Sequence, residues 1–344
     1  MVSVIIPVLN REKTISRAID SVIRQTYKDW ELIIVDDGCT DNTIRIVNKY
    51  KKKYNIRVVK NKLHGVASAR NTGILNSKGD YIAFLDSDDE WLECHLTESV
   101  TALQETNYKM CSSLWIENKF GKTEKIGTSG WYNDMFNEMK DSLGVDRSEK
   151  YWKFDSKLFK HILKTDFYCF HINTIVISRE ILTYNKLFDP DMKASEDLDF
   201  IYRLLQDNNI LTINNYHFIY HYGKDNLYAF IDRNALNVDD IVNNRKKCDR
   251  ICFNLKYKII LCEKLLKIIS TYKSGKEKSE IKRINVNTIY TRMMTYAYLC
   301  RKKHPLHSLF YCFKAAKFFR FNNGEKNYLF DFFSSNRKNN LYID

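Results

Sequence analysis

The sequence predicts an α/β fold in which a mostly parallel sheet is flanked by helices and followed by a mainly α-helical region. Strand-like and helix-like segments alternate four times over residues 1–105, and polar residues follow each strand-like segment. After about residue 235 the chain becomes helical and rich in Lys and Arg. We therefore expect an α/β domain over residues 1–235, in halves of 1–105 and 106–235, and a helical basic region over 236–344.

The first half alternates between β-branched runs and amphipathic helices. The predicted strands are residues 2–6, 31–35, 56–59 and 81–85. Asn10 is a candidate cap for the first helix, whose apolar face is Ile15, Ile19, Val22 and Ile23. Ile44 and Val47 mark a second helix, a third begins near Val66, and Leu92, Leu96, Val100 and Leu103 form the stripe of a fourth.

The remaining chain is less regular. INTIVIS (172–178) predicts a strand, SEDLDFIYRLL (195–205) a helix capped by Ser195, and ILTINNYHFIYHY (210–222) an extended segment. Beyond residue 235, apolar residues recur at helical spacing, as in Ile259, Ile260, Leu265, Leu266 and Ile269.

Composition bounds the cellular setting and the kind of partner. The 344 residues are 44% hydrophobic, which is too apolar for disorder, and the formal charge of +13 favours an anionic partner. The nine cysteines are scattered and form no CxxC pair, which favours a reducing cytosol. Neither a signal peptide nor an uncharged run of about 20 residues is visible, so we expect a cytoplasmic protein.

Polar residues cluster where the predicted strands end. Asn10 follows the first strand, Asp36 and Asp37 the second, Asn61 the third and residues 86–89 the fourth. Ligands of open parallel sheets bind beyond the carboxyl ends of the strands. The sequence therefore predicts a binding site on this rim.

The densest of these clusters lies in YIAFLDSDDEW (81–91). One interpretation is a polar turn that caps a helix starting near Glu90, because acids favour helix N-termini. The other is a divalent cation, because carboxylates spaced one residue apart can face one ion and one diphosphate. The turn accounts for only part of the cluster, so the cation is favoured.

Four segments resemble the motifs of the family 2 glycosyltransferases with the GT-A fold. They are VSVIIPVLNRE, ELIIVDDGCTDNT, GVASARNTG and YIAFLDSDDEW, in the order and spacing of that family. The resemblance is strong over residues 1–105, weakens to about 225 and is absent beyond. It implies a Rossmann-like GT-A sheet and an inverting transfer of a sugar from a UDP-sugar to an acceptor hydroxyl, with Mn²⁺ or Mg²⁺ as cofactor. The product would be capsule, lipopolysaccharide or another bacterial surface glycan.

The resemblance also implies a donor-binding set. Pro7, Asn10 and Glu12 would border the nucleoside, and Asp37 would accept a hydrogen bond from the uracil ring. Asn61 would complete this side of the pocket.

On the diphosphate side, the resemblance places Arg70 close to the base or diphosphate, Asp86 on the ribose and Asp88 on the metal. A metal on the departing diphosphate would stabilise the charge that develops there. The alternative for Arg70 is a simple ion pair with Asp36 or Asp37.

Inversion by direct displacement needs a carboxylate that takes the acceptor proton. The family draws it from a Glu-Asp pair at the start of a helix, and ASEDLDF offers Asp197 as the base with Glu196 as runner-up. An ordinary helix start with acids in its first turn is the structural alternative. Relatives often carry a metal-binding histidine after the next strand. His221 is the candidate here, although the usual spacing reaches Asp225.

The segment HPLHSLFYCFKAAKFFRF (304–321) interleaves aromatic and basic residues at helical spacing. It predicts either a helix in a membrane interface or, slightly favoured, a helix packed on the catalytic domain with a solvated basic face. The expected partners are a UDP-sugar and a glycan acceptor that can be lipid-linked. If residues 304–321 form a helix in a membrane interface, peripheral contact with the inner face of the cytoplasmic membrane is also expected.

Two other functions compete with sugar transfer. A nucleotidyltransferase acting on a sugar phosphate would need a Gly-rich loop after the first strand, and PVLNREKT has none. A non-catalytic protein that binds nucleic acid or another polyanion would explain the charge. It would leave Asp37, Asp86, Asp88 and Asp197 without a role, and acids on the rim would repel phosphate. We therefore expect no nucleic-acid partner.

Overall fold

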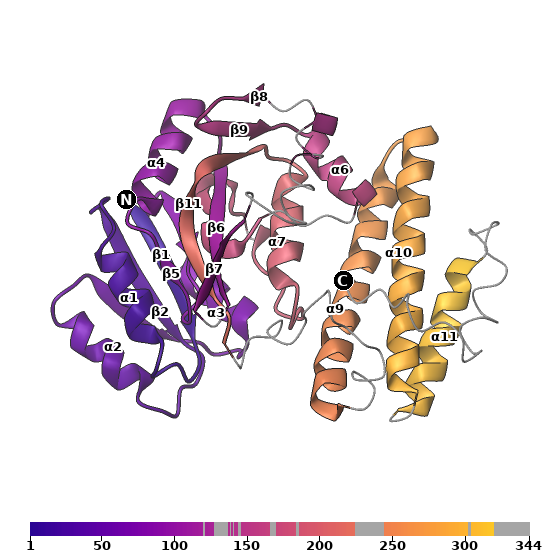
Figure 1. Ribbon diagram of the computed structural model, residues 1–344, viewed down its shortest axis with the longest axis horizontal. Coiled ribbons are helices and arrows are strands. Elements are labelled where there is room, and N and C mark those ends of the chain that lie inside the picture. Colours follow the sequence, from indigo (N-terminus) through magenta and orange to yellow (C-terminus); the bar gives the residue numbers. More distant parts are fainter. Residues whose placement is uncertain are drawn as a thin grey trace. The chain divides into compact units, whose positions relative to one another are not determined.

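A computed structural model describes residues 1–119, 121–126, 137, 139, 141–143, 146–165, 170–183, 186–223, 244–301 and 304–319. The chain forms two compact units, Met1–His161 with Tyr168–Lys224, and Ile162–Phe167 with Asp225–Asp344. Figure 1 shows the elements of each unit. The boundary predicted near residue 235 lies outside the described residues.

The elements up to the middle of the chain are β1 (Val2–Val8), α1 (Ile15–Ile23), β2 (Trp30–Asp36), α2 (Thr43–Lys51), β3 (Ile56–Lys60), α3 (Val66–Leu75), β4 (Tyr81–Phe84), β5 (Glu90–Trp91), α4 (His95–Thr106), β6 (Met110–Lys119) and β7 (Lys122–Lys125). Those that follow are β8 (Asp146–Arg147), β9 (Tyr151–Phe154), α6 (Lys157–Thr165), the 3₁₀ turns η1 (Ile172–Thr174) and η2 (Arg179–Ile181), β10 (Val176–Ser178), α7 (Glu196–Leu205) and β11 (Ile210–His221). The C-terminal helices are α9 (Arg245–Thr271), α10 (Lys276–Cys300) and α11 (Pro305–Phe319).

The strands of the first unit form one mixed sheet in the order β3-β2-β1-β4-β10-β6-β11-β9-β8, with β5 beside β11 and β7 beside β6. The strands β1 to β4 are mutually parallel, as predicted. β10 runs antiparallel to both β4 and β6, whereas β11 runs parallel to β6. All four N-terminal strands therefore end at the same edge of the sheet.

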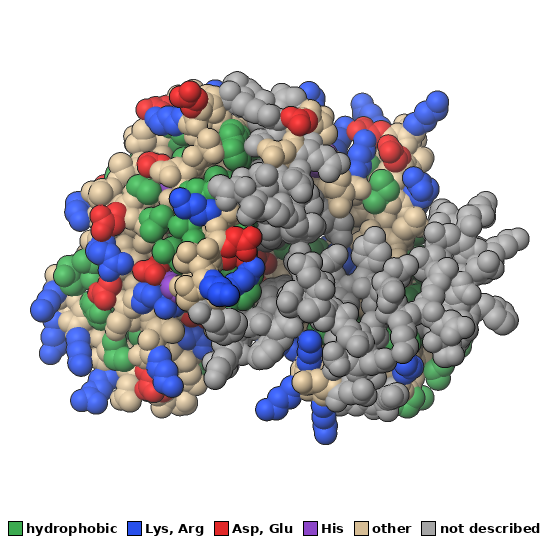
Figure 2. All heavy atoms as spheres, in the orientation of Figure 1, with side chains coloured by type: hydrophobic (Ala, Val, Ile, Leu, Met, Phe, Trp, Pro, Cys, Tyr) green, Lys and Arg blue, Asp and Glu red, His purple; other side chains and the backbone are tan. Residues whose placement is uncertain are grey.

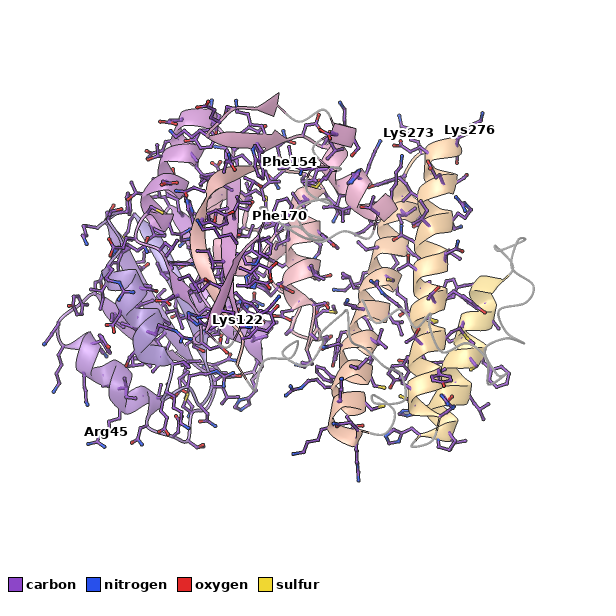
Figure 3. The ribbon with its side chains drawn as sticks, viewed as in Figure 1. Arg45, Lys122, Phe154, Phe170, Lys273 and Lys276 are labelled. Carbon is purple, nitrogen blue, oxygen red and sulfur yellow. The ribbon has the colours of Figure 1, made fainter. Side chains whose placement is uncertain are left out.

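Side chains of β1 alternate between two buried faces of the sheet. Val4 and Ile6 belong to a core that also contains residues of α1, α2 and α4. Ile5 points to the other face, against which α3 packs closely. This approach requires glycine at position 73, because a Cβ there would collide with Ile5. Further along the sheet, the buried rings of Phe154 and Phe170 lie 6.3 Å apart (Figure 3).

Three local predictions were wrong. The helix expected near Glu90 begins only at His95, because residues 90 and 91 pair with β11 as the short strand β5. INTIVIS is a 3₁₀ turn followed by the shorter strand β10. Asn10 does not cap α1, which begins at Ile15 after Thr14.

The second unit contains three helices that pack side by side (Figure 1). The predicted stripe of α9 is largely buried, including Ile259, Leu265 and Ile269. Lys273 and Lys276 lie at the turn between α9 and α10 and point away from the helices (Figure 3). No helix in the described ranges is both long and apolar enough to span a bilayer.

Basic side chains are scattered over the described part of the visible face (Figure 2). In the first unit they gather where Figure 1 places α2, and Arg45, Lys49 and Lys51 are exposed there. This surface accounts for part of the positive net charge.

Candidate active site

The loops that follow β1 and β2 are held together at the carboxyl edge of the sheet. The side-chain oxygen of Asn10 accepts a hydrogen bond from the amide of Thr40 at 2.8 Å, and Glu12 Oε2 accepts one from the amide of Asn42 at 3.1 Å. Pro7 lies buried in β1 opposite Val35. In this structure Asn10 and Glu12 therefore shape the rim by fixing its loops, and their contact with a nucleoside stays a prediction.

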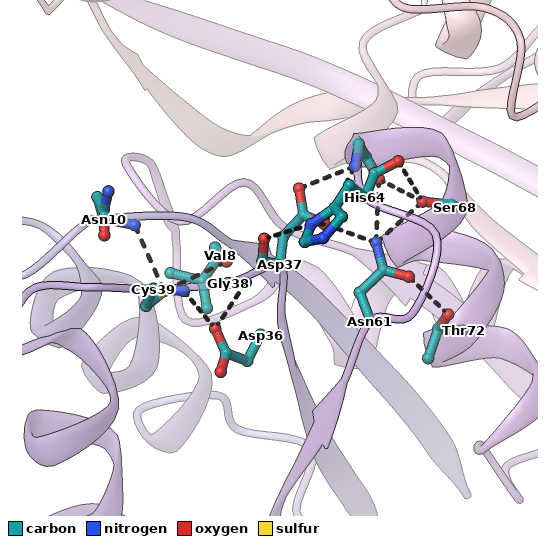
Figure 4. A network of polar contacts seen from close by, with 11 residues as sticks. Val8, Asn10, Asp36, Asp37, Gly38, Cys39, Asn61, His64, Ser68 and Thr72 are labelled. Atoms are coloured by element: carbon teal, nitrogen blue, oxygen red, sulfur yellow. Dashed lines mark hydrogen bonds and ion pairs between the residues drawn. The ribbon is translucent and has the colours of Figure 1, made fainter.

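Asp37 and Asn61 form the centre of a polar network at this edge (Figure 4). Asn61 Nδ2 donates to Asp37 Oδ1 at 2.6 Å, and the amide of Gly65 donates to both carboxylate oxygens, at 3.0 and 2.9 Å. His64 Nδ1 lies 3.2 Å from the Asp37 carbonyl oxygen. The network fixes the carboxylate that was predicted to bind uracil, and Asn61, which is buried, acts here by orienting Asp37.

Asp36 organises its own loop. Its Oδ1 accepts hydrogen bonds from the amides of Gly38 at 3.1 Å and Cys39 at 2.8 Å (Figure 4). This arrangement is a side-chain turn that lets the backbone reverse directly after β2.

Arg70 joins the two halves of the α/β unit. Its Nη2 donates to Asp86 Oδ1 and its Nη1 to Glu196 Oε1, each at 2.8 Å. The side chain is only 3% exposed. The alternative pairing of Arg70 with Asp36 or Asp37 is therefore wrong, and the bridge brings the strand-end acids together with the acidic start of α7.

Burial and neighbouring charges shift the pKa values of Arg70 and of Asp197, which lies beside the bridge. Burial alone would lower the pKa of Arg70, but Asp86, Glu196 and Asp197 raise it overall. Burial and the neighbouring Glu196 raise the pKa of Asp197 to about 6, although Arg70 opposes the shift. A carboxylate with that pKa is ionised at neutral pH and still basic enough to accept a proton.

Asp88 lies at the edge of the same acidic cluster and is 26% exposed. Burial and then Asp86 raise its pKa, while Arg11, whose Nε lies 3.6 Å from Asp88 Oδ2, opposes the shift. Arg17 donates to the Asp88 carbonyl oxygen. The Asp88 carboxylate is partly exposed, and burial and Asp86 disfavour its ionised form. A carboxylate of this kind suits a hard divalent cation, so the residues fit Mn²⁺ or Mg²⁺.

Two buried residues that the sequence did not single out hold the acidic loop in place. Asn173, on η1, accepts a hydrogen bond from the amide of Asp86 at 3.0 Å and donates to Asp89 Oδ2 at 2.9 Å. Asp89 Oδ1 also accepts from the amide of His221 at 2.8 Å. Asp89 is thus a structural acid. The INTIVIS segment that contains Asn173 gave no signal of this role, because it was interpreted as a plain strand.

His221 lies at the end of β11 beside the acidic loop. Its Nε2 is 2.8 Å from Glu90 Oε1, and burial lowers its pKa despite that contact. Its role as a metal ligand stays a prediction, and Asp225 lies outside the described residues.

Ser195 precedes α7 but does not cap it with its side chain. Its φ of 55° lies in the left-handed region, which is unfavourable for residues other than glycine, and its buried Oγ has no hydrogen-bond partner. Strain of this kind is common at functional sites. Here the left-handed backbone of Ser195 sets the direction in which the side chains of Glu196 and Asp197 project.

Comparison with known proteins agrees with this arrangement. The family model "Glycosyl transferase family 2" matches residues 3–183. An Escherichia coli protein named UDP-Glc:alpha-D-GlcNAc-diphosphoundecaprenol beta-1,3-glucosyltransferase WfgD is 30% identical over 222 residues, which cover 62% of this chain and 73% of that protein. The chain spans 22%, 33%, 48% and 25% of the lengths of four other curated relatives, all named as glycosyltransferases or glucosyltransferases.

Two solved structures share the fold. Staphylococcus aureus TarS 1–349 in complex with UDP has a TM-score of 0.54 at 18% identity, covering 98% of this chain and 93% of that one. The mannosyltransferase PcManGT from Pyrobaculum calidifontis, in complex with GDP-Man and Mn²⁺, also has a TM-score of 0.54, at 16% identity, covering 92% and 75%. The predicted GT-A fold is thereby confirmed. Because its family model matches more than half of the residues, this chain belongs to glycosyl transferase family 2.

Proposed function

We propose that this chain is an inverting, metal-dependent glycosyltransferase that moves a sugar from a UDP-sugar to a hydroxyl of a growing surface glycan. The observation that carries the proposal is the Arg70 bridge, which links Asp86 of the donor motif to Glu196 beside the base. Arg70 and Glu196, which are 126 positions apart in the sequence, meet there as a buried pair. Family membership favours sugar transfer over nucleotidyl transfer and over passive polyanion binding.

The residues divide the chemistry between them. Asp37, held by Asn61 and Gly65, presents a carboxylate to the imide of uracil, and Asp86 faces the ribose. Asp197 accepts the proton of the acceptor hydroxyl as that oxygen attacks the anomeric carbon. The bond from that carbon to the diphosphate breaks on the opposite side, which inverts the configuration.

Asp88 would hold the divalent ion, with His221 as the candidate second ligand. When bound, the ion supplies positive charge to the diphosphate as it departs. Two observations support this proposal: acidic side chains surround the site at Asp88, and the mannosyltransferase that shares the fold was solved in complex with Mn²⁺. Arg11 and Arg17, which lie against Asp88, can add positive charge on the same side.

Thermal stabilisation by nucleotide sugars tests the donor and the metal together. With Mn²⁺ present, a UDP-sugar should raise the melting temperature, whereas GDP-, CMP- and dTDP-sugars should not. Asp88→Ala should lose this response, and Glu93→Ala, an exposed carboxylate on the neighbouring segment, should keep it. A response that is equal with and without the metal, or that persists in Asp88→Ala, would contradict the assignment.

We further propose that the acceptor is lipid-linked and that α11 contacts an anionic membrane surface. Leu306, Leu309, Phe310 and Phe313 follow one face of this helix and are 54–80% exposed. The relative WfgD is named for an undecaprenol-linked acceptor. In vesicle sedimentation, binding should require anionic lipid and should fall in Phe313→Asp, whereas an exposed-lysine control, Lys122→Asp, should bind as the wild type does. Equal binding of both variants would refute the contact.

A further inference from the structure

Three side chains that can ligate a metal meet between α4 and β11, and none of them belongs to the donor or base residues. Ligand atoms of Cys94, Glu98 and His217 lie within 4.8 Å of one another. His217 Nε2 is 2.9 Å from Glu98 Oε2. The Cys94 thiol lies 3.8 Å from the carbonyl oxygen of Tyr216, the residue before His217.

The fold brings these residues together although Glu98 and His217 are 119 positions apart in the sequence. Cys94 immediately precedes α4, and Glu98 follows one helical turn later, so both face the same side. On the partner strand, the register between β11 and β6 shifts on both sides of Tyr216. Such bulges re-aim side chains, and His217 is completely buried beneath α4.

Neighbouring groups orient the candidate ligands. Asn215 Nδ2 donates to both oxygens of Glu98, at 3.0 and 3.1 Å. His95 Nδ1 lies 3.2 Å from His217 Nδ1, and the ring of Trp91 packs against His95 with a centroid distance of 4.3 Å. Partners of this kind on the far nitrogen of a histidine and on a carboxylate are typical of metal sites.

We propose that Cys94, Glu98 and His217 bind Zn²⁺ or a similar transition metal, with solvent completing the coordination. One thiolate, one imidazole and one carboxylate suit zinc, whereas Mg²⁺ and Mn²⁺ prefer oxygen ligands alone. Ligand atoms on a tetrahedral zinc lie about 3.5 Å apart. His217 Nε2 and Glu98 Oε2, at 2.9 Å, would therefore open by about 0.5 Å, and the other ligand pairs, all within 4.8 Å, would close by at most about 1 Å. The metal would be distinct from the ion expected at Asp88.

Binding would release a proton from the thiol. Burial and the neighbouring Glu98 raise the pKa of Cys94 to about 11, so without a metal the thiol is protonated at neutral pH. Ligation through His217 Nε2, which lies 2.9 Å from Glu98 Oε2, also requires the imidazole proton to reside on Nδ1, where His95 Nδ1 at 3.2 Å can accept it. On binding, the sulfur–hydrogen bond is replaced by a sulfur–metal bond and the proton leaves to solvent. The affinity should therefore rise with pH.

The ion would tie together two segments that support the active site. α4 follows the acidic loop, and β11 runs on from His217 to His221, whose amide binds Asp89. A metal between them would stabilise the position of the acidic loop without touching the substrate.

Cobalt titration of the full-length chain tests the proposal. After removal of bound metal with a chelator, one equivalent of Co²⁺ should produce the near-ultraviolet charge-transfer band of a cobalt–thiolate bond. Cys94→Ser should abolish the band, and Cys312→Ser, which alters a half-buried thiol on α11, should leave it unchanged. His217→Gln should keep a thiolate band but weaken cobalt binding about tenfold or more.

The result is separable from the proposed function, because Asp88→Ala should retain the band while losing the donor response. Absence of a charge-transfer band in the wild type, or its persistence in Cys94→Ser, would overturn the metal site. Either outcome would leave Glu98 and His217 as a hydrogen-bonded pair beside the half-buried thiol of Cys94.

Discussion

Replacement of Asp197 by asparagine should remove transfer and at the same time stabilise the folded protein. In the folded state the pKa of Asp197 is about 6, compared with an ordinary value of 3.8. Between these values the folded state binds more protons than the unfolded state, so stability falls as the pH rises through the folded pKa. At pH 7.5 Asp197 is ionised, so the folded state has the full loss of stability that this shift in pKa causes. A shift of about two pKa units corresponds to about 3 kcal/mol, and we expect about 2 kcal/mol because solvent partly screens the side chain.

Guanidinium unfolding at pH 7.5 and pH 4 measures this effect. Asp197→Asn should be more stable than the wild type at pH 7.5, and the difference should largely vanish at pH 4. Donor binding should persist, and in the wild type kcat/KM for transfer should fall about tenfold per pH unit below pH 6.

Asp199→Asn is the matched control, made two residues further along α7. The Asp199 carboxylate is 3% exposed and accepts from Arg203 Nε at 2.9 Å. The same substitution there should destabilise the protein, by about 3 kcal/mol, because it breaks a buried ion pair. The reasoning about Asp197 is refuted if Asp197→Asn is no more stable than the wild type at pH 7.5, or if it transfers sugar at the wild-type rate.

Three further substitutions test the supports of the site. Arg70→Met should destabilise the fold by about 3 kcal/mol in chemical unfolding, because it leaves the buried Glu196 and the partly buried Asp86 without their cation, whereas Lys150→Met, at an exposed ion pair, should leave the unfolding midpoint unchanged. Ser195→Gly should raise stability by about 1 kcal/mol because it relieves a left-handed backbone, and a loss of stability would argue against strain there. Asn173→Ala should cost about 3 kcal/mol because it leaves Asp89 Oδ2 without its donor and the Asp86 amide without its acceptor, and a melting temperature equal to that of the wild type would contradict this role.

The parallel half of the fold could be predicted because its signals are local. A run such as Ile33, Ile34 and Val35 indicates a buried strand by itself, and the spacing of Ile15 and Ile19 indicates one face of a helix. β5 could not be predicted in this way. It exists because Trp91 pairs with Phe218, which is far away in the sequence, and two residues alone carry no periodicity.

In the candidate site, too, the features that depend on local sequence were predictable and those that depend on distant residues were not. The rim was predictable because parallel strands must end at one edge, which places the residues after each strand near one another. The partner of Arg70 was not, because no local rule connects it to Glu196, 126 residues later. Asn173 was missed for a related reason, since its two contacts form only when η1 packs against the acidic loop.

The Arg70 bridge makes Asp86, on the proposed donor side, and Asp197, the proposed base, parts of one electrostatic unit. A single guanidinium is surrounded by Asp86, Glu196 and Asp197, so this cluster carries more negative than positive charge. A nucleoside diphosphate would add further negative charge and would raise the pKa of Asp197 beyond 6, which leaves less of the carboxylate ionised at neutral pH unless positive charge arrives with the donor. A divalent ion at Asp88 would supply it. The same ion that assists departure of the diphosphate would then keep Asp197 ionised, so the base would stay ready when the donor binds with its metal and would be largely protonated when the donor binds without it.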